Sequence, residues 1–317
     1  MNKYDLSIII PTYNTRECLK RTLNILESQY LKKFEIIIID DNSNDNTEDL
    51  IIEFQKFDND IKYIKNNSTK GPGLSRNIGI NNANGEFITF LDSDDWPDLN
   101  TYDAVTKVMK NNPNYDFSIW GVKKEYENSV LSQVRNNYDK TNVLNKDVAI
   151  SLLCNTNSLD ISISSYLGNK MFRSDFLRKN NLEFIGTLFE DVSFSFEAII
   201  YSREILLLPN TYTHYYQRSN SIVHSFTEKH INDMFSVLYY LKKIVDKKFP
   251  DFKKDFASLV EKCSKTLFNI MFDNVETPTE IRHFLCIYIE KLLEFTDVQE
   301  IFDYIDINRI KNILLNH

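Results

Sequence analysis

The stretch EFITFLDSDDW, residues 86–96, places apolar, strand-forming residues directly before a cluster of carboxylates. The run from Phe87 to Leu91 is typical of a buried strand. Asp92, Asp94 and Asp95 follow almost without spacing, and at that separation their charges repel one another. Such a cluster either faces open water or surrounds a positive charge, and the rest of the chain decides between the two.

Strand-like and helix-like segments alternate through the N-terminal third of the chain. Continuous apolar runs predict buried strands, and apolar residues on one helical face predict the helices between them. The predicted strands are residues 6–10, ended by Pro11, 34–40, 61–65 and 86–92, and the predicted helices are residues 17–28, 48–57 and 73–83. This rhythm predicts an α/β fold with a doubly wound, mostly parallel sheet.

Polar clusters follow three of these strands. PTYN (11–14), DDNSND (40–45) and DSDDW (92–96) stand at the carboxyl ends of predicted parallel strands, the edge at which such sheets bind ligands. Their convergence predicts a nucleotide site. The alternative is that they are ordinary polar loops, with Asn14 or Thr15 capping the first helix and Asp41 or Asn42 capping the second.

The rhythm changes after residue 97. Helices are predicted at residues 98–112, 147–154 and 190–202, antiparallel strands at 115–126 and 129–134, and one or two strands at 204–218. From residue 225 onward the pattern is helical, with apolar stripes such as Met234, Phe235, Leu238, Leu241 and Val245. These stripes predict a C-terminal helical appendage over residues 225–317.

Composition narrows the class of protein. The chain has 317 residues, 42% of them hydrophobic, and a net charge of −8, which favours a folded protein and disfavours a nucleic-acid binder. The four cysteines (Cys18, Cys154, Cys263 and Cys286) show no paired spacing, so we expect reduced, buried thiols without a zinc motif or disulfide framework. No apolar run reaches the ~20 residues of a membrane span, and no signal peptide is evident. We therefore expect a soluble, cytoplasmic protein.

Six motifs occur in the order and approximate spacing found in one enzyme family. They are SIIIPTYN (7–14), IIIIDDNSNDNT (36–47), GPGLSRNIGI (71–80), GEFITFLDSDDW (85–96), FEDVSF (189–194) and YYQRSNSI (215–222). Together they resemble the family-2 inverting glycosyltransferases, which use nucleotide sugars and have the GT-A fold. The resemblance implies a GT-A domain over residues 1–224, with a nucleotide-binding half (1–97) and an acceptor-binding half (98–224). The helical region, residues 225–317, falls outside it.

The resemblance implies a binding site for the nucleotide of the donor. A pyrimidine would stack on the ring of Tyr13, and Asp41 would accept a hydrogen bond from the N3–H of uracil. The guanidinium of Arg76 suits phosphate oxygens through its fork geometry, the alternative being a surface helix arginine. The other positions implied to bind the donor nucleotide are Pro11, Thr12, Asn14, Asp92, Ser93, Arg218 and Ser221.

DSDD matches the metal-binding motif of the GT-A fold. By that match Asp94 coordinates Mn²⁺ or Mg²⁺, and Asp92 supports the ion or touches the donor. These ions favour oxygen ligands and often take one or two carboxylates together with substrate phosphates. His224 and His214 are candidates for a third ligand, the alternative for each being a structural histidine.

EDVSF matches the stretch that supplies the general base in the family. Asp191 would deprotonate the acceptor hydroxyl, and Glu190 would orient the acceptor or its neighbours. The alternative is an ordinary acidic start of a helix, where the dipole stabilises an anion.

Lys170, Asp95 and Trp96 match positions on the donor-sugar and acceptor side of the site. Two residues depart from the family pattern, since Asn42 and Gly168 stand where relatives often have Gly and Trp. We expect the first change to alter its turn only slightly. The second would remove an aromatic wall near the sugar.

The resemblance as a whole implies a metal-dependent, inverting glycosyltransferase that moves a sugar from a UDP-linked donor to a hydroxyl and forms a β-linkage. The acceptor would be a growing bacterial surface glycan, a lipid-linked glycan or a glycoprotein. One alternative is a non-catalytic partner with the same fold that stabilises an active transferase. Another is a nucleotidyltransferase, although PTYNTRECLK (11–20) lacks the Gly-rich phosphate loop of that class. Association with the inner face of the cell membrane and with further copies of the chain stays open.

Overall fold

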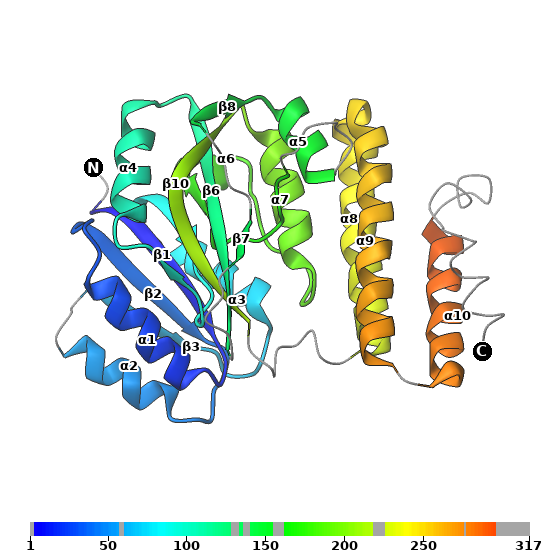
Figure 1. Ribbon diagram of the computed structural model, residues 1–317, viewed down its shortest axis with the longest axis horizontal. Helices are drawn as coiled ribbons and strands as arrows, with labels where there is room; N and C mark the ends of the chain where they lie inside the picture. The colour runs from blue at the N-terminus through cyan, green and yellow to red at the C-terminus, as the bar shows by residue number, and fades with distance from the viewer. Residues whose placement is uncertain are drawn as a thin grey trace. The chain divides into compact units, whose positions relative to one another are not determined.

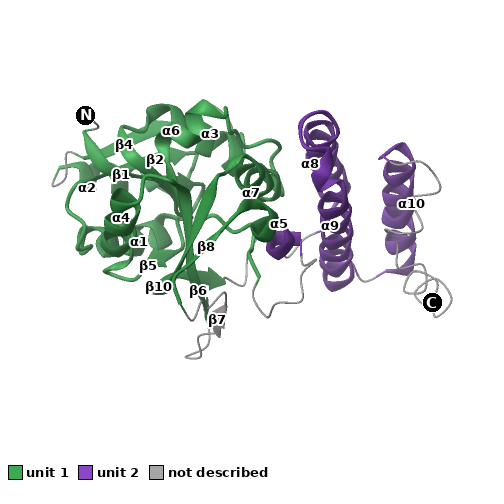
Figure 2. Cartoon of the chain, turned by 90° about the horizontal axis from the view of Figure 1, so that it is seen from above, with its two compact units in different colours: residues 1–150, 159–218 green, residues 151–158, 219–317 purple. Residues whose placement is uncertain are grey.

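The computed structural model describes residues 3–56, 60–127, 133–135, 140–154, 162–217, 226–275 and 277–295. They form two compact units, which are coloured separately in Figure 2. Unit 1 comprises residues 1–150 and 159–218, and unit 2 comprises residues 151–158 and 219–317. The division into domains at residue 224 stays a prediction.

Unit 1 begins with the predicted alternation of strands and helices (Figure 1). In chain order these elements are β1 Tyr4–Thr12, α1 Arg16–Glu27, β2 Phe34–Asp40, α2 Thr47–Gln55, β3 Ile61–Lys65, α3 Pro72–Asn82 and β4 Gly85–Phe90. The chain continues with β5 Trp96–Pro97, α4 Thr101–Asn111, β6 Tyr115–Tyr126, β7 Gln133–Arg135, β8 Asn142–Leu144, α5 Lys146–Cys154, β9 Lys170–Arg173, α6 Ser174–Lys179, α7 Glu190–Tyr201 and β10 Glu204–Gln217. Helix α5 contributes to both units.

All the strands join one sheet in the order β3-β2-β1-β4-β9-β6-β10-β5, with β7 beside β6 and β8 beside β10. Strands β3, β2, β1 and β4 are parallel, so the predicted parallel half is confirmed. The short strand β9, which the sequence pattern did not predict, runs antiparallel to both β4 and β6. It therefore joins the two halves of the sheet.

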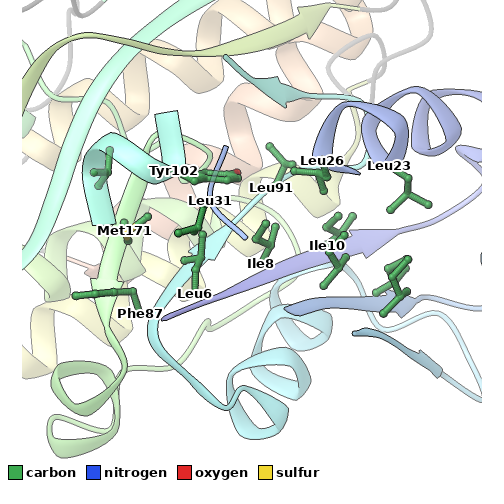
Figure 3. Close-up of a cluster of buried hydrophobic side chains, with 14 of the residues drawn as sticks. Leu6, Ile8, Ile10, Leu23, Leu26, Leu31, Phe87, Leu91, Tyr102 and Met171 are labelled. Carbon is green, nitrogen blue, oxygen red and sulfur yellow. The ribbon is translucent and has the colours of Figure 1, made fainter. Parts of the chain in front are cut away.

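The two faces of the sheet are covered by different helices, because successive residues of a strand point to opposite faces. Leu6, Ile8 and Ile10 of β1 lie in a buried cluster with Leu23 and Leu26 of α1 (Figure 3). Ile9 faces the other way, toward Gly79 of α3. The doubly wound arrangement is confirmed, with a core on each side of β1.

Strand β1 does not end at Pro11, contrary to the prediction. It continues to Thr12, and Pro11 pairs with Ile39 of β2. Proline lacks a backbone N–H, which normally excludes it from the middle of a sheet. The ladder between β1 and β4 has already ended at Ile9, and the carbonyl of Ile9 accepts from Leu91 on that side. The nitrogen of Pro11 points to the same side as Ile9, beyond the ladder, so no ladder bond is lost.

Unit 2 contains the three long helices α8 Glu228–Lys248, α9 Lys253–Asn274 and α10 Pro278–Phe295, with a short 3₁₀ turn, Pro250–Phe252, after α8. The predicted stripe on α8, from Met234 to Val245, is buried. On α10 the hydroxyl of Tyr288 donates to Ser264 of α9 at 2.7 Å. The helical content predicted for this part of the chain is confirmed.

Two expectations from composition are tested by the structure. No helix among the described residues combines the length and apolar character that crossing a membrane requires. No disulfide joins any of the four cysteines, all of which lie among the described residues. Cys154 and Cys263 are buried, but the prediction of buried thiols is wrong for Cys18, which is partly exposed, and for Cys286, which is exposed.

Gly79→Ala tests the close contact between α3 and β1. A Cβ at this position would lie 2.3 Å from Cγ2 of Ile9, so β1 and α3 must separate. We expect the free energy of unfolding to fall by about 1–3 kcal/mol, only partly offset by the ~1 kcal/mol that alanine gains over glycine in a helix. Urea unfolding followed by circular dichroism measures the change. Asn81→Ala, at an exposed position of α3, is the control, and equal midpoints for the two variants would contradict the packing argument.

Candidate functional site

The carboxyl ends of β1, β2 and β4 lie at one edge of the sheet, because these strands are parallel neighbours. A chain of hydroxyl groups joins two of the loops there. Thr15 Oγ1 lies 2.8 Å from Thr12 Oγ1 and 2.7 Å from Ser93 Oγ. The predicted convergence of PTYN with DSDDW is thus present in the structure, and Thr15 is a linking residue that the sequence pattern did not single out.

PTYN also contacts the loop after β2. The backbone N–H of Asn14 donates to Ser43 Oγ at 3.0 Å, and Asn14 Oδ1 accepts from the backbone of Asn44 at 2.9 Å. Between these loops the ring of Tyr13 is half exposed, at 50%. It is therefore accessible to a flat ligand.

Asp41 is buried at the end of β2 and organises the segment that leads into α3. Its carboxylate accepts from the backbone N–H groups of Lys70 (2.9 Å) and Gly71 (2.8 Å) and from Asn66 Nδ2 (2.8 Å). The alternative that Asp41 or Asn42 caps the following helix is wrong, because α2 begins at Thr47 after Asn46. Asn42 has a φ of 71°, the left-handed conformation that glycine adopts readily.

Arg76 is buried on α3 and forms two ion pairs with residues far apart in the sequence. Its Nη1 donates to Glu190 Oε1 at 2.6 Å, and its Nη2 donates to Asp92 Oδ1 at 2.7 Å. Its side chain is 6% exposed, so the alternative of a surface arginine is wrong. In the structure the guanidinium binds two carboxylates, whereas the family resemblance implied that it binds phosphate oxygens.

Arg76 and Glu190 have shifted pKa values, and Asp92 is the most exposed side chain of this triad. Burial lowers the pKa of Arg76, but the carboxylates of Asp92 and Glu190 outweigh it and raise that pKa above its ordinary value. Burial raises the pKa of Glu190 despite the opposing effect of Arg76. Asp92 is more open than Glu190, with 36% of its side chain exposed. The open end of the triad therefore lies at the DSDD loop.

Helix α1 holds the backbone of the DSDD loop. Thr22 Oγ1 lies within hydrogen-bond distance of the carbonyls of Ser93 (3.1 Å) and Asp95 (2.9 Å). Arg21 Nη2 donates to the carbonyl of Asp94 at 2.6 Å. These bonds fix the loop through its main chain.

The three carboxylates of the loop differ in their surroundings. Asp95 is fully buried and accepts from Tyr166 Oη (2.5 Å) and from the backbone of Tyr216 (2.8 Å). Burial, followed by the charges of Asp92 and Asp94, raises the pKa of Asp95 well above its ordinary value. The predicted contact of Asp95 with the donor sugar or acceptor is wrong in this structure, because its carboxylate points into the protein.

Trp96 and His214 form a stacked pair next to this loop, with ring centroids 5.1 Å apart. The guanidinium of Arg21 lies 4.1 Å from the Trp96 ring. The ring nitrogens of His214 face Glu125 Oε1 (2.7 Å) and Asp98 Oδ1 (2.9 Å). Those partners are not the DSDD carboxylates, so the suggestion that His214 completes their metal site is wrong.

Glu190 and Asp191 begin helix α7, as predicted. Asp191 is partly exposed, and its Oδ2 accepts from the hydroxyl of Ser165 at 2.6 Å. Ser165 was not predicted, because nothing in a serine-rich loop marks one serine over its neighbours. The two acidic residues thus have separate partners, Arg76 for Glu190 and Ser165 for Asp191.

Lys170 is buried at the start of β9 and faces away from solvent. Its ammonium donates to the carbonyls of Ser164, at 2.8 Å, and Tyr166. Burial lowers the pKa of Lys170 to about 7, against the opposing effect of Asp191. The predicted placement on the donor-sugar side is therefore wrong for its charged group, which holds the loop that carries Ser165.

The ring of Tyr166 lies against Gly168, the position at which relatives often have Trp. A Cβ at Gly168 would lie 2.1 Å from Tyr166 Oη. The ring of Tyr166 thus occupies this place, and Tyr215 packs edge-on against it with centroids 5.2 Å apart. The expected loss of an aromatic wall near the sugar stays a prediction. Arg218, Ser221 and His224 lie outside the described residues.

A metal site can be assessed from the oxygen atoms at the sheet edge. Among the described residues no group of three or more His, Cys, Asp or Glu side chains could hold an ion. Asp92 and Asp94 supply two carboxylates, with only Ser93 between them in the chain. This set fits Mn²⁺ or Mg²⁺, which take one or two carboxylates and complete their shell with phosphate oxygens and water.

Comparison with known proteins points to one family. Residues 7–163 match the model of glycosyl transferase family 2. Over these residues, just under half of the chain, the protein is similar to this family. The match covers the DSDD loop and stops before Asp191.

One relative in the family is the GalNAc(5)-diNAcBac-PP-undecaprenol beta-1,3-glucosyltransferase of Campylobacter jejuni, 32% identical over 173 residues. The match covers 54% of the present chain and 55% of that protein, so the chain spans about half the length of this relative.

Solved structures of similar proteins show the same GT-A fold. Staphylococcus aureus TarS residues 1–349 in complex with UDP superposes with a TM-score of 0.67 at 21% identity, over 95% of the present chain and 89% of TarS 1–349. The mannosyltransferase PcManGT of Pyrobaculum calidifontis, solved with GDP-Man and Mn²⁺, has a TM-score of 0.57 at 15% identity, over 99% and 88% of the two chains. The predicted GT-A fold is confirmed.

Arg76→Met tests the central triad. The substitution leaves Glu190 buried without its cation, and we expect the free energy of unfolding to fall by about 3–5 kcal/mol at neutral pH. The folded-state pKa of Glu190 is already raised, so protonation relieves the penalty. The loss should therefore shrink as the pH falls through that pKa. Denaturant unfolding at several pH values measures both effects.

The matched control for Arg76→Met is Lys107→Met, which breaks the exposed pair with Asp103. We expect it to cost no more than ~0.5 kcal/mol at any pH. A pH-independent loss in Arg76→Met would show that packing, and not the charge of Glu190, causes the effect.

Proposed function

We propose that this protein is a metal-dependent, inverting glycosyltransferase that moves a sugar from a UDP-linked donor to a hydroxyl of a growing surface glycan. The observation that carries the proposal is the Arg76 triad, which connects the DSDD loop to the start of α7. It supports the proposal because Asp92, a candidate cation ligand, and Glu190, the chain neighbour of the candidate base Asp191, bind the same guanidinium. A cation and a base are both needed for transfer from a nucleotide diphosphate sugar.

The nucleotide would bind over the PTYN and DDNSND loops. The half-exposed ring of Tyr13 is available to stack on a base, and Thr12, Asn14 and Ser93 line the same edge. Asp41 already accepts from main-chain N–H groups. It would therefore bind the N3–H of uracil with a carboxylate that the protein has oriented beforehand. The complex of TarS with UDP supports the choice of a uridine nucleotide.

The cation would be held by Asp94 and Asp92. A Mn²⁺ or Mg²⁺ ion bound there would neutralise charge on the diphosphate leaving group. The presence of Mn²⁺ in the PcManGT structure supports this assignment. Arg218, Ser221 and His224 are also proposed to contribute to donor binding.

Asp191 acts as the general base in this proposal. Its carboxylate takes the proton of the acceptor hydroxyl while the oxygen attacks the anomeric carbon. The bond between that carbon and the diphosphate breaks on the opposite face, so an α-linked donor gives a β-linked product. The ion pair with Arg76 fixes the side chain of Glu190. Because Glu190 precedes Asp191 in the chain, the proposed base follows a residue that is held in place.

The acceptor class is proposed from the relatives. The Campylobacter jejuni protein is named for an undecaprenol-linked glycan and a beta-1,3-linkage. We propose a glycan of this lipid-linked type, which would bring the protein to the inner face of the cell membrane. The GT-A domain, residues 1–224, would carry catalysis, and the helical region, residues 225–317, would contact the acceptor or a second copy of the chain.

A screen of nucleotide sugars with Mn²⁺ tests the donor. We expect one or more UDP-sugars to raise the melting temperature of the protein and to be hydrolysed slowly, and we expect GDP-sugars to have no effect. Asp94→Ala should lose the stabilisation, because Asp94 would hold the cation that neutralises charge on the diphosphate. Thermal shift and release of UDP are the measurements. Absence of a response to every UDP-sugar would overturn the donor assignment.

Asp191→Asn tests the base. The amide keeps the size of the side chain but cannot take a proton, so we expect kcat to fall by about 10²–10⁴-fold with UDP binding unchanged. Transfer to a lipid-linked glycan and calorimetric titration of UDP are the measurements. Asp103→Asn, on the exposed surface of α4, is the control. Near-normal turnover of Asp191→Asn would show that another group is the base, and the absence of any transfer by the wild-type chain would favour the non-catalytic partner.

A further inference from the structure

Ser165 contacts helix α7 at two points one helical turn apart. Its hydroxyl donates to Asp191 Oδ2 at 2.6 Å. Its carbonyl accepts from the hydroxyl of Ser195 at 2.9 Å. Residues four apart on a helix lie on the same face, so Ser165 is docked on the face of α7 that carries Asp191.

The loop around Ser165 is held from within the protein. The buried ammonium of Lys170 donates to the carbonyls of Ser164 and Tyr166, the residues on either side of Ser165. It also donates to Asn169 Oδ1 at 3.3 Å, so three acceptors of one loop surround a single cation. The hydroxyl of Tyr166 donates to buried Asp95, which ties the same loop to the DSDD segment.

These contacts restrict the carboxylate that would act as base. A carboxylate near the surface rotates about its terminal bond unless a partner holds one oxygen. The hydroxyl of Ser165 occupies Oδ2 and leaves Oδ1 as the oxygen to receive a proton. A small misplacement of a reacting group costs up to about a hundredfold in rate, so a partner that fixes the carboxylate bears directly on turnover.

We propose that Ser165 is a positioning residue for the transfer reaction: its hydroxyl orients Asp191 so that one carboxylate oxygen faces the acceptor. The proposal rests on the assignment of Asp191 as base. Lys170 contributes indirectly, because its ammonium binds the carbonyls on both sides of Ser165. The loop of residues 162–169 thereby becomes part of the acceptor side of the site, although its sequence carries no acidic or basic side chain.

Ser165→Ala tests the proposal with the full chain, a UDP-sugar that the donor screen identifies and a hydroxyl acceptor. We expect kcat to fall about 10- to 100-fold, whereas the KM for the donor and the affinity for UDP stay within about twofold. Ser165→Thr keeps a hydroxyl at the same place and should restore most of the rate. Ser202→Ala, which removes another hydroxyl from the end of α7, is the matched control and should leave kcat unchanged.

The outcomes separate this inference from the proposed function. If Asp191→Asn abolishes transfer but Ser165→Ala turns over normally, Asp191 is the base and Ser165 does not position it. If Asp191→Asn retains activity, the base assignment fails first. If Ser165→Ala loses UDP binding or melts at a markedly lower temperature, and Ser165→Thr does not restore the rate, the serine maintains the fold of the loop and the positioning role is overturned.

Discussion

The buried guanidinium of Arg76 is the interaction on which the site depends. It bonds to Asp92, after the end of β4, and to Glu190 at the start of α7, two segments far apart in the sequence. Burying the charged groups of Arg76 and Glu190 costs free energy unless each has a partner in good geometry. The fork of an arginine can serve two carboxylates at once. Lysine has no such geometry, so the identity of this residue sets the distance between the loop after β4 and α7.

Around this triad, the loops at the sheet edge are fixed mainly through hydroxyl groups and main-chain carbonyls. Thr12, Thr15 and Ser93 form a hydrogen-bonded row between β1 and β4. Arg21 and Thr22 hold the DSDD carbonyls from α1. These bonds shape the loops largely through hydroxyl groups and backbone, and the Asp92 side chain stays 36% exposed beside its ion pair with Arg76. This is the arrangement expected of a site whose final charge balance includes a bound ion and a diphosphate.

The sequence predicted the parallel half of the sheet and the convergence of its three polar loops, because both follow from local alternation and from the direction of the strands. It did not predict β9, whose residues Lys170–Arg173 are too few to show a period. The partners of Arg76, the inward direction of Asp95 and the contact of Ser165 with Asp191 were also not predicted. Each joins residues far apart in the chain, and no local pattern specifies such a contact. The place of Pro11 inside β1 was not predicted either, because it depends on where the pairing of β1 with β4 ends.

The contact between Tyr166 and Gly168 has a consequence for how the sugar side of the site can change. The phenol oxygen of Tyr166 occupies space that any larger residue at 168 needs. An aromatic ring therefore reaches this place from one position or from the other, but not from both. Homologues and engineered variants are expected to exchange the two residues as a pair. A single substitution at Gly168 would expel the tyrosine from Asp95 and disturb the loop that ends at Lys170. Recombining this region between family members requires moving residues 166 and 168 together.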